Sequence, residues 1–281
     1  MPELPEVETT KRQLEKKIVG QKIEKIKILS AKQFIGNPKT IENLVIKGIS
    51  RRAKIIIIQL TKGPMLLIHL KMTGQLVYAD KTKNDKAVFG HPIPFAGGKT
   101  LPGKATGIII RLSRGQIFFN DLRKFGWMKI TQNSDQETKH LGPEPLSKQF
   151  TLTYLKEILS KSKRPIKAFL LDQNKIAGIG NIYASEILFL SGIDPRTPAN
   201  KVKDAKKLHQ SIKKILLKAI KYQGSSAADE AYIKPDGTPG KYQNHFLVYQ
   251  QEGQPCKKCK TKIKRIKINQ RSSYFCSRCQ K

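Results

Sequence analysis

The stretch 256-CKKCKTKIKRIKINQRSSYFCSRC-279 contains all four cysteines of the 281-residue chain, arranged as two Cys-x2-Cys pairs. Residues 260–275 separate the pairs. Each pair can present two thiolates to one metal ion, and two pairs complete a closed tetrahedral site. The alternative, two disulfides, needs an oxidising compartment, of which the sequence gives no sign. We therefore expect one structural zinc ion, held by Cys256, Cys259, Cys276 and Cys279.

The residues between the two cysteine pairs have the pattern of a β-hairpin. Apolar residues alternate with basic ones over residues 262–268, and a polar turn follows that ends near Arg271. From Gly253 to Lys281 there are ten Lys or Arg residues and no acid. We expect the finger to approach phosphates, with Arg271 at the turn, where a side chain can reach forward.

The whole chain is strongly basic, with 54 Lys+Arg against 21 Asp+Glu and a formal net charge of +33. Such a charge indicates a polyanionic partner, because each phosphate that a Lys or Arg neutralises releases a counterion. An anionic membrane surface is the competing interpretation. The sequence shows no apolar run near 18 residues, no secretory pattern and no lipidation motif. We expect nucleic acid as the partner and a cytoplasmic, nucleoid-associated location.

Acidic residues cluster at the N-terminus, where MPELPEVET occupies residues 1–9. If Met1 is removed, Pro2 becomes a secondary amine with a pKa of about 8, which makes it a usable nucleophile at neutral pH. The carboxylate of Glu3 could then move the protons that such an attack requires. A second interpretation is a helix start, with proline early in the helix and acids complementing its dipole. The two interpretations are compatible.

Hydrophobic patterning predicts two structural regions before the finger. We expect a β-sandwich or flattened barrel over residues 1–131 and a hinge over residues 132–149. A helical bundle is expected over residues 150–245 and the finger over residues 246–281. Residues 79–106 are rich in Lys, Gly and Pro without periodicity, which predicts a long loop. The expected strands are 22–29, 41–49, 54–60, 65–70, 75–78, 107–112, 116–119 and 127–130, and the expected helices are 152–159, 165–171, 181–190 and 205–221.

The turn Gly178-Ile179-Gly180-Asn181 opens one of these helices. Its glycines would let backbone amides approach an anion, although such a pattern is as typical of an ordinary tight turn.

Seven ordered motifs span nearly the whole chain: residues 1–9, Arg51–Lys54, Ile68–Met72, Asp121–Gly126, His140–Leu146, Gly178–Glu186 and the four-cysteine finger. Together they resemble the bacterial formamidopyrimidine-DNA glycosylase family. The start with Leu4 and Val7 is more similar to this family than to the related endonuclease VIII.

The resemblance implies an α+β fold with an N-terminal β-sandwich and N-terminal helix, a helix-two-turns-helix DNA-binding domain and a zinc-finger β-hairpin. It implies that damaged duplex DNA is held in the cleft between domains. We expect a monomer, because one enzyme per lesion suits a monomer. Pro2 would attack C1′ of an oxidised purine nucleotide, and Glu3 would manage the proton transfers. The resulting Schiff base would permit β- and δ-elimination. Lys54 and Arg271 would donate protons or position phosphates, and Glu6 would support Glu3 or hold a water.

The resemblance also implies that the lesion is turned out of the DNA helix. Unstacking a base costs a few kcal/mol, which inserted side chains partly offset. Met72, Arg123 and Phe125 match the void-filling residues. By spacing alone, Met72 and Phe125 are more typical of core residues, but Phe125, beside Gly126 in a basic turn between strands, is the better candidate for a wedge. The remaining DNA contacts implied by the resemblance are Asn181, Lys163, Lys167 and His69, the last of which could instead be a buried structural histidine.

The chain departs from the family pattern at two places. Lys104-Ala105-Thr106-Gly107 stands where the family usually has Lys-His-x-His, so one phosphate contact is missing there, and His91 in the preceding insertion could replace it. The loop at 224–229 lacks a bulky residue near Ala228, which leaves the preference among oxidised purines open. The alternatives are an endonuclease VIII-like activity on oxidised pyrimidines and a DNA-binding protein without activity.

Overall fold

The computed structural model describes residues 1–80, 86–94, 97–226 and 232–281. The chain forms two compact units, neither of which is a single range of sequence. The first unit contains residues 1–139 and 222–243, and the second contains residues 140–221 and 244–281. The sequence predicts four consecutive segments, at 1–131, 132–149, 150–245 and 246–281. In the structure, residues 222–243 of the third segment pack with the first unit, and the finger belongs to the same unit as the helices of the third segment.

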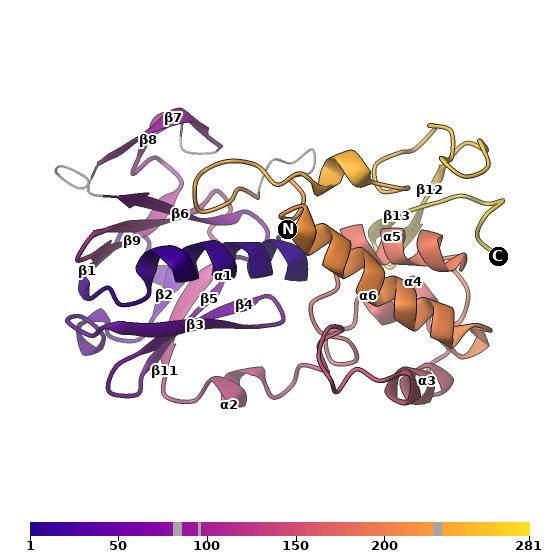
Figure 1. Ribbon diagram of the computed structural model, residues 1–281, viewed down its shortest axis with the longest axis horizontal. Coiled ribbons are helices and arrows are strands. Elements are labelled where there is room, and N and C mark those ends of the chain that lie inside the picture. The colour runs from indigo at the N-terminus through magenta and orange to yellow at the C-terminus, as the bar shows by residue number, and fades with distance from the viewer. Residues whose placement is uncertain (81–85, 95–96, 227–231) are drawn as a thin grey trace. The chain divides into compact units, whose positions relative to one another are not determined.

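The first unit is a β-sandwich of two sheets, as predicted, and Figure 1 shows these sheets with helix α1 (Leu4–Ile18) beside them. One sheet has the order β1-β9-β10-β6 and the other has the order β2-β11-β5-β4-β3. The strands are β1 (Ile23–Ile28), β2 (Phe34–Ile35), β3 (Ile46–Arg52), β4 (Ile55–Leu60), β5 (Met65–His69), β6 (Gly74–Asp80), β9 (Thr106–Leu112), β10 (Gly115–Asp121) and β11 (Trp127–Thr131).

The core between the two sheets is built by alternation along the strands. Ile108 and Ile110 of β9 and Ile117 and Phe119 of β10 point to the same interior as Ile56 and Ile58 of β4. Helix α1 contributes three further side chains to this core: Val7, Leu14 and Ile18. Because these helix positions are four to seven residues apart, one face of α1 is fixed against the sandwich. This packing sets the direction of the helix's first turn.

The predicted long loop at 79–106 is partly wrong, because its described residues include the hairpin of β7 (Ala87–Ile93) and β8 (Gly98–Leu101). Ala87, Ile93 and Leu101 pack with Val77, Ile109 and Phe118 on the outer face of the four-stranded sheet. Gly90 and Pro92 interrupt β7 and its register shifts between Val88 and Ile93, which hid the strands in the sequence. Residues 81–85 and 95–96 of the predicted loop lie outside the described residues.

Two smaller differences concern strand and hinge boundaries. The expected strand 41–49 begins later in the structure, as β3, so residues 41–45 lie before it. The short 3-10 helix η2 (Pro38–Thr40) lies just before these residues. The expected hinge at 132–149 contains the short helix α2 (Ser134–Thr138), which Asn133 caps by accepting from the N–H groups of Asp135 and Gln136. Another short 3-10 helix of this unit, η1 (Ala31–Gln33), carries the buried Gln33.

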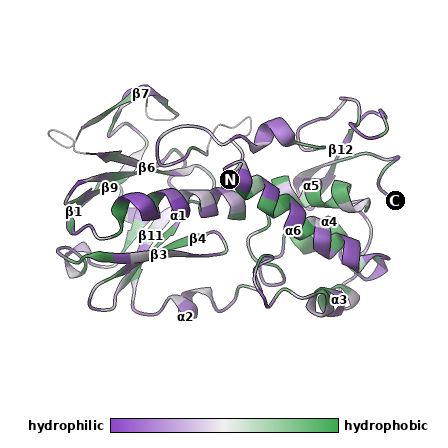
Figure 2. Cartoon of the chain, viewed as in Figure 1, coloured by the Kyte–Doolittle hydropathy of each residue, from purple (hydrophilic) through white to green (hydrophobic). Residues whose placement is uncertain are grey.

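The second unit combines the predicted helices with the finger hairpin. In α6, six residues including Leu208, Ile212 and Ile215 are buried on one face, and six of the other eleven residues are lysines. Figure 2 shows the resulting mixture of hydrophobic and hydrophilic colours along α6. The elements are α3 (Leu152–Ser160), α4 (Ile166–Leu170), α5 (Asn181–Ser191), η3 (Ala199–Lys201), α6 (Ala205–Lys221), β12 (Lys264–Ile268) and β13 (Arg271–Phe275), while η4 (Tyr242–His245) spans the boundary between the units.

None of the helices in the described residues combines the length and the apolar character needed to cross a bilayer.

Candidate functional site

The first turn of α1 brings the predicted catalytic residues of the N-terminus together. Pro2 is buried, and Glu3 and Glu6 are 2% and 1% exposed. An Oε2 atom of Glu6 accepts the backbone N–H of Glu3 at 2.9 Å. This bond satisfies a donor that the helix start leaves without an intrahelical partner, and it fixes the backbone of Glu3. The same residues, Glu3 and Glu6, thus form the helix start and are the candidates for catalysis.

Glu6 also binds a segment far away in the sequence. Its Oε1 atom accepts the backbone N–H of Ser225 at 2.7 Å. Gly224 has a φ of +75°, and a Cβ atom there would lie 2.8 Å from Glu6 Oε1. A side chain at 224 would therefore meet both backbone strain and the carboxylate. The turn at 224–225 is held against the helix start through this one carboxylate.

The turn that carries Lys54 is tied to the same helix. Lys54 is 7% exposed and follows Ala53, whose φ is +52°. Arg51 donates to the carbonyl of Ala53 at 2.7 Å and to Glu8 Oε2 at 2.9 Å. The bonds to Arg51 and Arg12 and their positive charges outweigh burial and lower the pKa of Glu8. The Glu8 carboxylate therefore stays ionised and anchors the turn at Ala53.

His69 ends β5 and pairs with Ile55 across the sheet, next to Lys54. Its Nδ1 accepts the backbone N–H of Lys71 at 2.9 Å. Burial, followed by the charges of Lys71 and Lys54, lowers the pKa of His69 to about 3. The imidazole is therefore neutral at pH 7. A neutral ring can donate to a phosphate through its other nitrogen but adds no charge.

Met72, Arg123 and Phe125 come from two turns and lie together. Arg123 Nη1 is 3.0 Å from Met72 Sδ, and the guanidinium carbon of Arg123 lies 4.8 Å from the centroid of the Phe125 ring. Phe125 is 53% exposed, which is unusual for so large an apolar side chain. Spacing alone indicated core positions for Met72 and Phe125. The structure instead places Phe125 on the surface and Met72 half-buried beside Arg123.

The four cysteines converge as the zinc prediction requires. All four Sγ atoms lie within 4.8 Å of one another. The Cys256–Cys279 and Cys259–Cys276 sulfur pairs are 3.9 Å and 3.4 Å apart. Disulfide sulfurs would be about 2.05 Å apart, whereas ligands 2.3 Å from one ion in a tetrahedron are about 3.8 Å apart. The residues fit a zinc ion, with no protein-derived position left for a reacting water.

Arg271 lies directly after a two-residue turn between β12 and β13. Asn269 and Gln270 have φ values of +46° and +60°, and Ile268 pairs with Arg271, which is the geometry of a tight hairpin turn. Arg271 is exposed and lines a hollow of about 460 Å³ together with Arg164, Gln173 and Asn174. Within the second unit, the finger turn thus faces the segment that joins α4 to α5.

Asn181, Lys163 and Lys167 occupy three different environments in the second unit. Asn181 begins α5 behind the glycine turn, which Gln173 holds by accepting from the N–H of Gly178 and donating to the carbonyl of Ile179, both at 2.8 Å. Lys163 is exposed. Lys167 is 0% exposed and donates to Ser185 Oγ at 2.7 Å and to the carbonyl of Ser272 at 3.1 Å. Its ammonium joins α4 and α5 to the residue after Arg271.

Comparison with known proteins decides the family. Models of the formamidopyrimidine-DNA glycosylase N-terminal domain, the formamidopyrimidine-DNA glycosylase H2TH domain and the zinc finger found in FPG and IleRS match residues 1–128, 141–230 and 253–281. The formamidopyrimidine-DNA glycosylase of Pelotomaculum thermopropionicum is 38% identical over 100% of this chain and 99% of its own. The chain belongs to the formamidopyrimidine-DNA glycosylase family.

Solved structures of this family share the fold over the full length. The MutM (Fpg) protein of Thermus thermophilus is similar with a TM-score of 0.85 and 33% identity, covering 99% of this chain and 98% of that one. A variant of Lactococcus lactis Fpg, solved with DNA that contains Fapy-dG, is similar with a TM-score of 0.86 and 34% identity over 100% of both chains. The predicted α+β fold with its helix-two-turns-helix domain and zinc-finger hairpin is confirmed.

Glu186, the last residue of the motif Gly178–Glu186, has a structural role that the sequence did not predict. Glu186 of α5 is 0% exposed and accepts the backbone N–H groups of Leu247, Val248 and Tyr249 at 2.8, 3.0 and 2.9 Å. Burial raises the pKa of Glu186 while these three N–H groups oppose that shift. The carboxyl group fixes the chain that enters the finger. In the sequence, the signal for such a role is that Glu186 is the one charged residue of α5.

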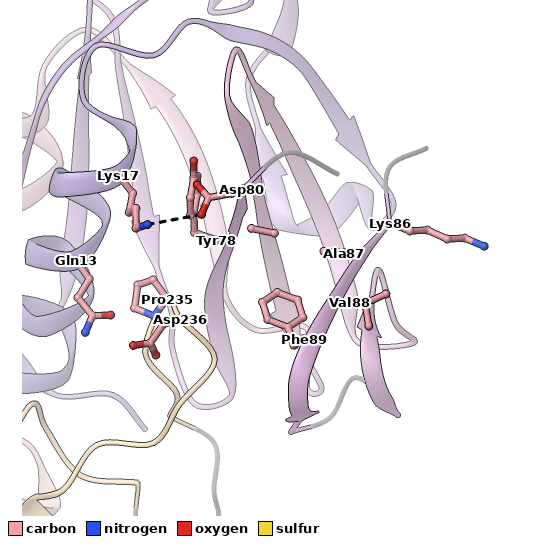
Figure 3. A pocket seen from close by; sticks show the side chains of 11 residues that line it. Gln13, Lys17, Tyr78, Asp80, Lys86, Ala87, Val88, Phe89, Pro235 and Asp236 are labelled. Atoms are coloured by element: carbon pink, nitrogen blue, oxygen red, sulfur yellow. Dashed lines mark ion pairs between the residues drawn. The ribbon is translucent and has the colours of Figure 1, made fainter. Parts of the chain in front are cut away.

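The first unit also contains a pocket of about 770 Å³ that none of the predicted site residues of this glycosylase lines. Figure 3 shows it between α1, β6, β7 and the loop at Pro235 and Asp236. The hairpin insertion supplies Phe89 and Val88 to one wall. His91 of that hairpin lies near Gly237, where a Cβ atom would be 2.8 Å from its ring. Residues 227–229 of the predicted loop at 224–229 lie outside the described residues.

Proposed function

We propose that this member of the glycosylase family is bifunctional and removes oxidised purines from duplex DNA, then cleaves the strand as an AP lyase. The observation that carries the proposal is the start of α1, where Pro2 and the carboxylates of Glu3 and Glu6 are buried together. Charged groups are rarely buried unless they are held by hydrogen bonds, and functional groups are a frequent reason for the exception.

The reaction begins at the Pro2 nitrogen once Met1 has been removed. The nitrogen lone pair attacks C1′, the N-glycosidic bond breaks and the base leaves with a proton. Opening of the sugar ring gives an iminium ion. Loss of a C2′ proton then expels the 3′ phosphate, and a second elimination expels the 5′ phosphate. Glu3 is the group at hand for these proton transfers, and Glu6 fixes its backbone through the 2.9 Å bond.

Two cations are proposed to assist the eliminations. Lys54 is buried on a turn fixed by Arg51 and Glu8, so its ammonium has a defined position. Arg271 presents five donors from the rigid turn of the finger, where a phosphate can be held by two of them. Lys167, which is buried beneath that turn, supports Arg271 through Ser272. We therefore give Lys167 a structural role and keep Lys163 and Asn181 as proposed phosphate contacts.

Turning the lesion out of the DNA helix is assigned to half-buried Met72 together with exposed Arg123 and Phe125. An exposed ring beside a guanidinium can enter the space that the displaced base leaves and stack there. Neutral His69 is proposed to hold a neighbouring phosphate. Ser225 next to Glu6 is buried, and its hydroxyl has no hydrogen-bond partner within the described ranges. The displaced base is the partner that we propose for it.

Oxidised purines are the first substrate class, with oxidised pyrimidines as a second candidate. Lactococcus lactis Fpg has been solved with DNA containing Fapy-dG and also with DNA containing an oxidized pyrimidine. The remaining proposals are one structural zinc ion, a monomer acting on one lesion and a place on cytoplasmic nucleoid DNA.

Strand incision on matched duplexes tests the proposal. One set would carry a single 8-oxoguanine opposite cytosine, another a single oxidised pyrimidine, and a third no lesion. We expect the fastest incision at 8-oxoguanine and none on the undamaged duplex. Glu3→Gln should bind the lesion duplex but lose base excision, because proton transfer alone is removed. Faster incision at the pyrimidine would favour the second candidate, and binding without incision of any duplex would contradict an enzymatic function.

A further inference from the structure

Asp121 is a fully buried acid, 0% exposed, at the end of β10. Its Oδ2 accepts the backbone N–H of Gly126 at 2.6 Å, and its Oδ1 accepts the backbone N–H of Arg123 at 3.2 Å. The two donors are at either end of the turn that presents Arg123 and Phe125. One carboxylate therefore closes this turn on itself.

The same carboxylate reaches the neighbouring turn. The hydroxyl of Thr73 donates to Asp121 Oδ1, and Thr73 Oγ1 accepts the N–H of Arg123 at 3.1 Å. Thr73 directly follows Met72. Because both turns bind one buried group, neither can shift without breaking bonds to a charged acceptor, which are among the stronger hydrogen bonds in proteins.

Gln33 of η1 completes the arrangement from a third segment. Its Nε2 donates to the carbonyl of Gly126 at 3.2 Å and lies 3.4 Å from Asp121 Oδ2. A Cβ atom at Gly126 would lie 2.6 Å from the Phe119 ring, so the backbone of the turn sits directly on the core. The base of the turn is rigid although Phe125 at its tip is 53% exposed.

We propose that Asp121 is a positioning residue that holds Met72, Arg123 and Phe125 as one preassembled unit for insertion into the DNA stack. This inference rests on the proposed function and adds the group that orders the inserted side chains. Rigid support matters because a displacement of about 1 Å far from the chemistry can cost about 100-fold in rate. Asp121 itself does not touch the DNA in this proposal and acts through Thr73, Arg123 and Gly126.

The test compares Thr73→Val, which removes the hydroxyl, with Thr73→Ser, which keeps it, and adds Asp121→Asn. The duplex carries one 8-oxoguanine and a neighbouring fluorescent base analogue whose emission rises when the stack opens. We expect Thr73→Ser to match the wild type. Thr73→Val and Asp121→Asn should lower the fluorescence amplitude and slow excision roughly tenfold or more. Cleavage of an abasic site in a single-stranded oligonucleotide, where no stack must open, should change less than about twofold.

The outcomes distinguish a failure of the proposed function from a failure of the positioning role of Asp121. A wild type that incises no lesion duplex would overturn the proposed function and this inference with it. With an active wild type, equal behaviour of Thr73→Val and Thr73→Ser would overturn the inference alone. Equal losses on duplex and single-stranded substrates would also overturn it, because they would indicate a general structural defect. If Asp121→Asn does not fold, the Thr73 pair still decides.

Discussion

The start of α1 and the finger are the two ends of the chain, and they fix functional side chains in different ways. At the start of α1, Glu6 joins Glu3 to Ser225 through two hydrogen bonds, on a helix whose apolar face packs into the sandwich core. In the finger, the turn with Arg271 is supported by four converging cysteines and by the bonds of Lys167 and Glu186. From this difference we expect the proposed chemistry at the first end to depend on packing and polar contacts, and the placement of Arg271 to depend on the proposed zinc ion.

Loss of the metal should show this contrast most strongly. Chelation of zinc or Cys276→Ser should reduce affinity for lesion DNA by roughly 100-fold or more, because a structural zinc site contributes folding free energy to the finger. The first unit should keep its melting transition. Calorimetry of the full chain with and without chelator, together with DNA binding, would measure both. Unfolding of the first unit in the same transition would contradict the expectation that only the finger depends on zinc.

Zinc loss should reach further than the finger itself. Phe189 of α5 packs with Cys256 and Cys276, and Gln280 donates to the carbonyl of Ile193 at 2.8 Å. We therefore expect hydrogen exchange to increase at the C-terminal end of α5 after chelation, while the start of α1 stays protected.

Replacing Glu6 should act at the other end. Glu6→Gln leaves one acceptor oxygen for the N–H groups of Glu3 and Ser225, so one buried donor loses its partner at a cost of about 1–3 kcal/mol. We expect a lower melting temperature of the first unit and slower excision, with unchanged zinc content. Glu15→Gln on the same helix is the control, because its 42% exposed ion pair with Lys11 should change stability by less than about 1 kcal/mol. Equal effects of the two variants would argue against a special role of Glu6.

At neutral pH, the titration of His69 is the smallest expected effect, because its loss of stability begins only as the pH falls below 6.5. Its pKa is lowered to about 3 from the ordinary value of 6.5, so the unfolded chain binds the proton that the folded chain excludes. The stability is complete above pH 6.5 and is lost as the pH falls toward 3, by up to about 1.4 kcal/mol per pH unit. His69→Gln should flatten that part of the melting-temperature curve. An unchanged slope would show that His69 accepts the proton in the folded state.

Much of the fold was predictable because its signals are local. The cysteine spacing, the alternation in β12 and the apolar face of α6 each use a period that a sequence displays directly. The β7–β8 hairpin was missed because Gly90 and Pro92 interrupt its pattern and because its partners, such as Phe118, lie on a strand distant in the sequence. The packing of 222–243 with the first unit is similarly a long-range contact, made through Gly224 and Ser225.

The candidate site was predictable as a set of residues but not as a set of contacts. Pro2 and Glu3 were found from their place at the N-terminus, and the resemblance supplied Met72, Arg123 and Phe125. Exposure separated Phe125 from an ordinary core residue, and burial separated Lys167 from an ordinary surface lysine. The roles of Glu186 and Asp121 depend on which backbone N–H groups surround each carboxylate. Such information arises when the chain folds.

Borohydride trapping tests the central claim, that the Pro2 nitrogen is the nucleophile, most directly. The substrate would be a duplex with one 8-oxoguanine opposite cytosine, and the proteins would be the wild type without Met1, Pro2→Gly and a form that retains Met1. Retained Met1 makes the Pro2 nitrogen an amide without a nucleophilic lone pair. We predict a covalent adduct with the processed wild type, located at Pro2 by peptide mapping, and no adduct when Met1 is retained. An equal yield with retained Met1, or tight binding with neither adduct nor cleavage, would contradict the claim.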